Sequence, residues 1–338
     1  DLKTASNPSV SPNDKAVAFT VHQFDRSSHQ ASTDIFVKSL GSASALNQIT
    51  STGTASKPAW SPDSKTIAYL DEDDSGVRQI FTRIASGGEP KMITSQVANI
   101  DAIAWSPDGS KIAFRGLEPG SDELEAINAD PSIPKIRTAR RIRYQQDGVG
   151  WRGDSFYHIF VHDLSSNKSV QITNGEGDDG PPVWSPNGKQ IAFITDQNTE
   201  REQTSKTELY TRNTDGSSLT KWSGDMFMIE SIAWSPSGNR IAVTGGQNKS
   251  EVGGYGLTTQ SSVYILEPGK IPLKLTDDSI RPHANGTGFP VTADSPFMSW
   301  PEHGAGIVFG ADSKGQSHIA ISNPKSPGDV RLVTDGWA

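Results

Sequence analysis

The sequence predicts an all-β protein, and two observations carry this prediction: the composition and a repeated phrase. Its 338 residues include 32 Gly and 21 Pro, which favour turns, and 8 Trp and 12 Phe, which supply large apolar anchors. Only 33% of the residues are hydrophobic, yet this profile differs from that of a disordered chain. Frequent turns between short apolar segments are typical of an all-β domain.

One phrase recurs along the chain: an apolar strand end, a Ser-Pro turn with Asp, Asn or Gly, and a second alternating strand. The Ser-Pro pairs begin at residues 11, 61, 106, 185 and 235, and a decayed sixth copy begins at Trp300. Each copy predicts a β-hairpin, because these residues favour tight turns and alternation such as Ile112 and Phe114 favours strands. The longest spacing separates the third and fourth pairs, so the third repeat carries an insertion.

A third strand and a short fourth strand follow in most units, as in Asp34–Val37 and Gln48–Thr50. Four antiparallel strands in about 45 residues are typical of a β-propeller blade, which buries both faces only when neighbouring blades stack on it. We expect one domain over residues 1–338, with six units visible and a seventh missing. The expected units are 1–50, 51–95, 96–174 with an insertion at 117–157, 175–222, 223–276 and 277–334.

The recurring Trp side chains are expected to wedge between adjacent blades rather than bind a ligand, because large aromatic rings supply most of the buried area in such stacking. These blade anchors are Trp60, Trp105, Trp184, Trp234 and Trp300.

Composition also excludes several classes of function. The formal net charge is −8, so binding to the phosphates of nucleic acid is not expected. No apolar run reaches the length of a membrane-spanning helix, and the sequence shows no signal peptide. With no Cys there is no disulfide, thiolate nucleophile or Cys-bound zinc, and the compartment stays open, with the cytoplasm favoured.

Neither a metal nor a cofactor is expected. The acidic stretches Asp71–Asp74 and Glu176–Asp179 lack the twelve-residue calcium-loop pattern and are interpreted as solvated turns. His158 and His318 occupy the same position in their repeats, which indicates a structural role. The remaining histidines are expected at loops or strand surfaces: His22, His29, His162, His283 and His303.

The insertion is the most informative segment outside the repeats. It is acidic and interrupted by Pro over residues 118–134, and then basic over residues 135–143. Arg there could bind a peptide carboxylate through two hydrogen bonds, and Glu could pair with a substrate amine. The alternative is a solvated strand edge or internal salt bridges. The candidates for contact with substrate or a partner domain are Glu123, Glu125, Arg141, Arg143, Tyr144 and Trp151.

The Trp-Ser-Pro-Asp-Gly-x-x-Ile-Ala-Phe units resemble those of TolB-type propellers and of the propeller in prolyl oligopeptidase-family serine peptidases. Residues 141–151, Arg-Ile-Arg-Tyr-Gln-Gln-Asp-Gly-Val-Gly-Trp, are similar to the third-blade insertion of the acylaminoacyl-peptidase and dipeptidyl-peptidase-5 branch, which TolB-like proteins generally lack. The resemblance implies a seven-bladed propeller followed by a C-terminal α/β-hydrolase domain that holds Ser, Asp and His. It also implies that the propeller admits short peptides and excludes folded proteins.

No Gly-x-Ser-x-Gly nucleophile elbow occurs in the chain, so no catalytic residue is assigned and the chain alone is expected to hydrolyse nothing. The expected partners are a C-terminal hydrolase domain of the same polypeptide and a short peptide. A strand edge near Val333 is expected to favour oligomers. The alternative function is a stand-alone TolB-like scaffold for protein or peptide interaction, which would favour the periplasm.

Overall fold

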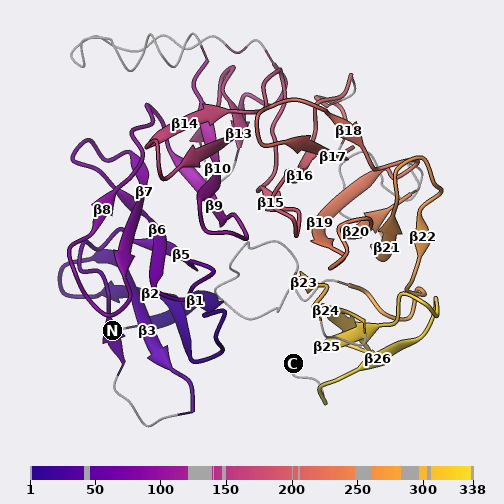
Figure 1. The fold of residues 1–338 in the computed structure, drawn as a ribbon, viewed down its shortest axis with the longest axis horizontal. Helices are drawn as coiled ribbons and strands as arrows, with labels where there is room; N and C mark the ends of the chain where they lie inside the picture. Colours follow the sequence, from indigo (N-terminus) through magenta and orange to yellow (C-terminus); the bar gives the residue numbers. More distant parts are fainter. Residues whose placement is uncertain are drawn as a thin grey trace. The chain divides into compact units, whose positions relative to one another are not determined.

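A computed structural model describes residues 2–41, 46–120, 139, 141–146, 150–199, 201–204, 206–247, 261–282, 297–302 and 306–335. Within these ranges the regular secondary structure consists of β-strands (Figure 1). Glu123, Glu125, His283 and His303 lie outside the described residues. The chain divides into two compact units, Asp1–Arg140 with Gln145–Asn174, and Arg141–Tyr144 with Gly175–Ala338, which are described separately.

The first unit contains three four-stranded antiparallel sheets, here called blades 1 to 3. Blade 1 consists of β1 (Leu2–Val10), β2 (Ala16–Asp25), β3 (Gln30–Ser39) and β4 (Asn47–Gln48). Blade 2 consists of β5 (Ser56–Trp60), β6 (Thr66–Glu72), β7 (Arg78–Ile84) and β8 (Lys91–Met92). Blade 3 consists of β9 (Ile100–Trp105), β10 (Lys111–Glu118), β13 (Phe156–Asp163) and β14 (Lys168–Gln171). A two-stranded ribbon, β11 (Gln145–Gln146) and β12 (Gly150–Trp151), intervenes in sequence between β10 and β13.

The second unit contains blades 4 to 6. Blade 4 consists of β15 (Val183–Trp184), β16 (Gln190–Thr195), β17 (Glu208–Asn213) and β18 (Thr220–Lys221). Blade 5 consists of β19 (Met228–Trp234), β20 (Ile241–Gly246), β21 (Ser262–Leu266) and β22 (Leu273–Lys274). Blade 6 consists of β23 (Met298–Ser299), β24 (Ile307–Ser313), β25 (Gln316–Ser322) and β26 (Val330–Leu332). The expected architecture of four-stranded antiparallel blades is confirmed.

Strand order is the same in all six blades, because each blade follows the chain from first strand to fourth. The N-terminal strand β1 pairs with β2 in blade 1, and the four described strands of blade 6 come from residues 298–332. The N-terminal strand therefore does not complete the last described blade.

The Ser-Pro turn that joins the first two strands is built on the serine. In blade 2 the Ser61 hydroxyl donates to the Asp63 carboxylate at 2.6 Å and accepts the backbone N–H of Thr66 at 2.9 Å. Ser106 makes the equivalent bonds to Asp108 and Lys111. The buried serine thus satisfies a backbone donor that the tight turn leaves unpaired, which explains why the phrase repeats.

The apolar core lies between neighbouring blades rather than within one. In the first unit, Ile35 of blade 1 and Trp60 and Tyr69 of blade 2 share one cluster, and Ile80 and Phe114 belong to the next cluster, between blades 2 and 3. Two further clusters in the second unit join blade 4 to blade 5 and blade 5 to blade 6. One blade alone cannot bury both of its faces, so stacking supplies the stability.

The recurring Trp side chains also bond across blades. Nε1 of Trp60 donates to the carbonyl oxygen of Ser9 at 3.0 Å, and Nε1 of Trp105 donates to that of Ala59 at 3.0 Å. In the second unit Nε1 of Trp234 donates to the carbonyl oxygen of Val183 at 3.2 Å. Trp184 is buried, and Trp300 packs against the cluster between blades 5 and 6.

Candidate interaction site

The described residues of the insertion belong to both units. Residues 141–144 pack with the second unit, whereas residues 145–146 and 150–151 form the ribbon β11–β12 in the first unit. In that ribbon Trp151 is paired with Gln145, and its side chain is partly buried. Tyr144 is 39% exposed.

Arg141 and Arg143 lie against the loop between β16 and β17 of blade 4. Nε of Arg141 is 3.3 Å from Oε1 of Glu202, and only 11% of the arginine side chain is exposed. The backbone N–H of Arg143 donates to Oε2 of the same carboxylate at 2.9 Å, and its Nη2 donates to the carbonyl oxygen of Thr204 at 2.6 Å. Two sequence-predicted candidates therefore share Glu202.

Asp196 forms the inner side of this cluster. Its carboxylate lies 4.0 Å from Nη1 of Arg143 and accepts the backbone N–H of Asp178 at 2.6 Å. Burial raises the pKa of Asp196 and the negative charge of Asp178 adds to the effect, while Arg143 and Arg141 oppose it. The two arginines thus supply positive charge that offsets the neighbouring negative charges of Asp196 and Asp178, both of which are partly buried.

Arg201 forms the outer side of the same cluster. Its Nη2 is 2.6 Å from the carboxylate of Glu176, which is mostly exposed, and its Nε is 3.8 Å from that of Glu202. Arg141, Arg143, Arg201, Asp196 and Glu202 are named here the insertion cluster. It contains no nucleophile, and among the described residues no group of His, Cys, Asp and Glu is arranged to hold a metal ion. Its chemistry is ion pairing and hydrogen bonding.

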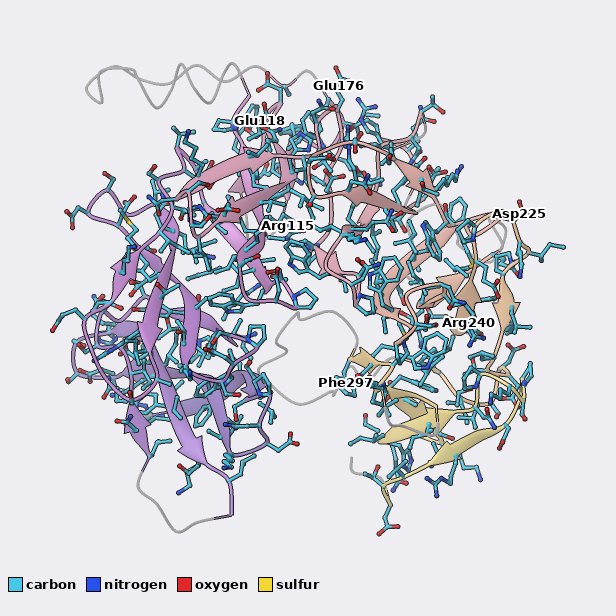
Figure 2. The ribbon with its side chains drawn as sticks, in the orientation of Figure 1. Arg115, Glu118, Glu176, Asp225, Arg240 and Phe297 are labelled. Atoms are coloured by element: carbon cyan, nitrogen blue, oxygen red, sulfur yellow. The ribbon has the colours of Figure 1, made fainter. Side chains whose placement is uncertain are left out.

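Sequence reasoning missed Asp196, Arg201 and Glu202, because they come from an ordinary blade connection with no motif. It also missed a cation–π group in the first unit. The Arg115 guanidinium bonds to Asp101 and lies 4.7 Å from the centroid of the Tyr157 ring, which Arg152 approaches at 5.3 Å. Arg115 and Glu118 lie along β10 (Figure 2).

Two expectations about charged and titratable residues are wrong in part. Asp71 and Asp179 are buried rather than solvated, at 3% and 0% exposure. Asp71 lies in β6 and accepts hydrogen bonds from the hydroxyls of Thr52 and Thr54, which offset the loss of water. His162 is likewise buried rather than on a strand surface.

The other described histidines have defined surroundings. Nε2 of His158 is 3.3 Å from the Glu118 carboxylate, and Nδ1 of His318 is 3.0 Å from the carbonyl oxygen of Thr334. His22 contacts the Ser6 hydroxyl at 2.6 Å, and His29 is exposed in a turn. None of the bonds described here joins a His to both a carboxylate and a serine hydroxyl. No helix of the described ranges has the length and apolar character to span a membrane.

Comparison with known proteins finds a family match over part of the chain. Residues 142–264 match the family described as the dipeptidyl peptidase IV N-terminal region, and this match begins one residue after Arg141. The chain is 29% identical over 231 residues to dipeptidyl-peptidase 5 of Porphyromonas gingivalis, which covers 62% of the chain and 32% of that protein.

Solved structures show the same fold. The acylaminoacyl peptidase of Pyrococcus horikoshii has a TM-score of 0.71 at 17% identity, covering 99% of this chain and 46% of that one. The β-propeller domain of the trilobed protease from Pyrococcus furiosus, described as having an open velcro topology, has a TM-score of 0.60 at 16% identity and covers 99% of this chain and 86% of that one. The chain thus spans less than half of the peptidases it matches. Residues 142–264 are thus similar to the dipeptidyl peptidase IV N-terminal region, and the chain shares its fold with part of the acylaminoacyl peptidase and with the propeller domain of the trilobed protease.

Proposed function

We propose that the chain is the non-catalytic propeller of an acylaminoacyl- or dipeptidyl-peptidase-like serine peptidase, where it caps the active site of a C-terminal α/β-hydrolase domain and restricts access to short peptides. The observation that carries the proposal is a difference in coverage: the shared fold takes in 99% of this chain but 46% of the acylaminoacyl peptidase. The remainder of such a protein is long enough for a further domain.

The propeller would act by exclusion and positioning. A propeller over the reacting bond would remove bulk water and hold a short peptide in place, while a Ser-His-Asp triad in the partner domain performs the chemistry. A folded protein is too wide to enter such an enclosure. The enzyme is therefore expected to select substrates by size. A charged residue of the peptide far from the cleaved bond is expected to have little effect on cleavage.

Within this function we propose that the segment 141–144 lies where the propeller meets the substrate or the hydrolase domain. Glu202 and Thr204 bind Arg141 and Arg143, so these arginines fix the segment to blade 4. Tyr144 follows directly and keeps 39% of its surface exposed. Tyr144 is therefore the proposed contact residue and the two arginines are positioning residues. Glu123, Glu125 and Trp151 remain candidates for contact with substrate or the hydrolase domain.

The test uses the native, full-length protein. The same cleavable sequence would be presented as a chromogenic dipeptide, as an unfolded polypeptide and as an exposed loop of a folded carrier protein, and kcat/KM would be measured for each. We expect cleavage of the dipeptide and no cleavage of the folded carrier. Equal kcat/KM for the dipeptide and the carrier would contradict size restriction. A protein that cleaves none of them and forms a stable complex with another protein would favour the scaffold alternative.

A further inference from the structure

Two grooves occupy equivalent positions in the repeat, one in each unit. The first, named groove 2/3, has a volume of about 540 Å³ and lies between blades 2 and 3, lined by Pro62, Asp63, Thr66, Trp105, Asp108 and Leu164 among others. The second, named groove 5/6, has a volume of about 460 Å³ and lies between blades 5 and 6, lined by Pro236, Arg240, Trp300, Pro324 and Lys325 among others. Each combines the Ser-Pro turn of one blade with the Trp of the next.

In groove 5/6 the chain places its own cation against the indole. The guanidinium carbon of Arg240 lies 5.2 Å from the centroid of the Trp300 ring, which is a cation–π distance. Arg240 and Lys325 make the described lining of this groove basic. A planar guanidinium stacked on an indole is therefore a contact that this repeat can form.

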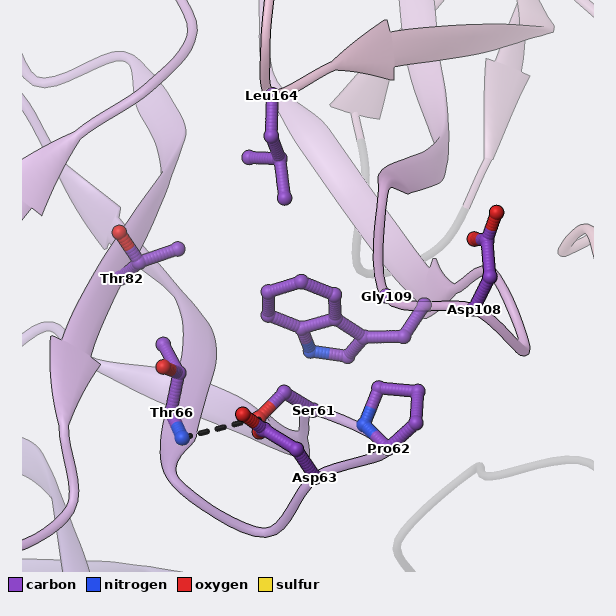
Figure 3. Close-up of a pocket in the computed structure, with 9 residues that line it drawn as sticks. Ser61, Pro62, Asp63, Thr66, Thr82, Asp108, Gly109 and Leu164 are labelled. Atoms are coloured by element: carbon purple, nitrogen blue, oxygen red, sulfur yellow. Dashed lines mark hydrogen bonds between the residues drawn. The ribbon is translucent and has the colours of Figure 1, made fainter.

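The described lining of groove 2/3 contains no cation that could stack on the indole. Thr66 occupies the position of Arg240, because each follows its turn serine by five residues and donates its backbone N–H to that serine hydroxyl, at 2.9 and 3.0 Å. Thr is short and neutral, so it leaves a face of the partly buried Trp105 ring within the groove. Figure 3 shows Leu164 on one side of this cavity and Pro62 and Asp63 on the other.

The charge of groove 2/3 is opposite to that of groove 5/6. Its lining contains Asp63 and Asp108 and no Lys or Arg. Hydrogen bonds from the Ser61 hydroxyl and the Lys65 backbone lower the pKa of Asp63, and similar bonds from Ser106 and Ser110 lower the pKa of Asp108 to about 2. Both carboxylates are exposed and ionised at neutral pH.

Two lysines stand near this groove without lining it. The positive charge of Lys65 contributes to the lowered pKa of Asp63, and that of Lys111 contributes to the lowered pKa of Asp108. Nζ of Lys111 is 3.0 Å from the carboxylate of Asp163, so Lys111 forms an ion pair with a residue that does not line the groove. The lining itself therefore keeps two negative charges beside an aromatic ring.

We infer that groove 2/3 binds an arginine side chain of an extended peptide segment, with the guanidinium stacked on Trp105 and bonded to the Asp63 carboxylate at the groove wall. Arginine is favoured over lysine because a planar guanidinium stacks on an indole and donates to a carboxylate at the same time, as Arg240 stacks on Trp300. Asp108 adds charge at the rim. Because the carboxylates are exposed, binding is expected to be weak, with a dissociation constant on the order of 1 mM.

The test uses the full 338-residue chain and two probes, acetyl-Gly-Arg-Gly-amide and the same peptide with citrulline, which has the shape of arginine without its charge. The readout is the indole N–H resonance of Trp105 in a nitrogen–proton correlation spectrum, assigned with Trp105→Phe. We expect the arginine peptide to shift this resonance and to bind roughly tenfold more tightly than the citrulline peptide. Equal affinity for the two peptides, or no shift of Trp105, would overturn the inference.

Two variants test the geometry. Thr66→Arg gives groove 2/3 the occupant of groove 5/6, so it should abolish binding, whereas the neutral control Thr66→Gln should change affinity by less than about threefold. Asp63→Asn with Asp108→Asn should weaken binding roughly fivefold. Asn preserves the turn, because Asn187 accepts the equivalent bonds from Ser185 and Lys189 in blade 4, at 2.9 and 3.0 Å.

Thermal unfolding of each variant shows whether it is folded. If Thr66→Arg does not fold, the paired Asn variant decides, because Asp63 and Asp108 are exposed and their turn is retained. Unchanged affinity in the paired Asn variant, or parental affinity in a folded Thr66→Arg variant, would overturn the inference.

Discussion

The backbone N–H of Arg143 donates to the carboxylate of Glu202 at 2.9 Å, although 59 residues separate them in the sequence. The same carboxylate pairs with Arg141. One acidic side chain from a blade 4 loop thus fixes the basic end of the insertion.

Replacing Glu202 with Ala is expected to release this segment. Trypsin would then cut after Arg143 about tenfold faster. The segment must open locally to expose this bond, and without Glu202 the opening no longer has to break the contacts of its carboxylate with Arg141 and with the Arg143 backbone. Cleavage is followed by mass spectrometry of the fragment that begins at Tyr144. The control is Glu267→Ala, which removes an exposed pair with Lys270 elsewhere in the second unit. Equal cleavage rates for parent and Glu202→Ala would show that Glu202 does not hold the segment.

Trp60 offers a test of stacking between blades 1 and 2. Trp60→Phe removes the hydrogen bond to the Ser9 carbonyl while keeping an aromatic ring, and should lower the free energy of unfolding by about 1–2 kcal/mol. Trp60→Ala also leaves a cavity and should cost about 3–5 kcal/mol. Urea unfolding of both variants measures these values. A cost below about 1 kcal/mol for the Ala variant would be inconsistent with a packed wedge.

His162 predicts a pH dependence of stability. Burial lowers its pKa from the ordinary value of 6.5, and the Lys91 charge adds to this, while Asp163 opposes it. Below pH 6.5 the unfolded chain therefore binds a proton that the folded chain does not, so stability falls as the pH falls toward the folded-state pKa. His162→Gln should flatten the decline in unfolding free energy between pH 7 and pH 5, and the exposed His29→Gln should not. A parallel decline in parent and His162→Gln would contradict this assignment.

Tyr144 tests the proposed contact surface in the native peptidase. Tyr144→Ala is expected to raise KM several-fold for short peptides and to leave kcat nearly unchanged, because a binding contact away from the reacting bond is removed. Tyr144→Phe keeps the ring and is the matched control. A loss confined to kcat, or parental kinetics in the Ala variant, would exclude Tyr144 from substrate contact.

The blades were predictable from the sequence because their signals are local. The turn at Ser61 and Asp63 is built from residues within one phrase, and it joins β5, which alternates in burial toward its end, to β6, which is buried along most of its length. Composition alone would not have been sufficient. The repeat made the prediction firm, since a blade is stable only beside another blade.

The environments of single charged residues were not predictable in the same way. Asp71 belongs to an acidic run that resembles a solvated turn, but hydroxyls 17 and 19 residues away make its burial favourable. His162 is buried by the packing of its blade, and its position in the sequence of the strand does not indicate this burial. Glu202 and Asp196 meet the insertion only through folding, so no spacing in the sequence relates them to Arg143.

The most direct test of the central claim is to capture the native gene product from its source under protease inhibition, with an antibody against this chain, and to treat it with a fluorophosphonate probe that labels activated serines. The account predicts one labelled polypeptide whose intact mass exceeds the 36.3 kDa of this chain by roughly 25 to 30 kDa, the size of one further domain. An unlabelled product with a mass of 36.3 kDa would contradict it.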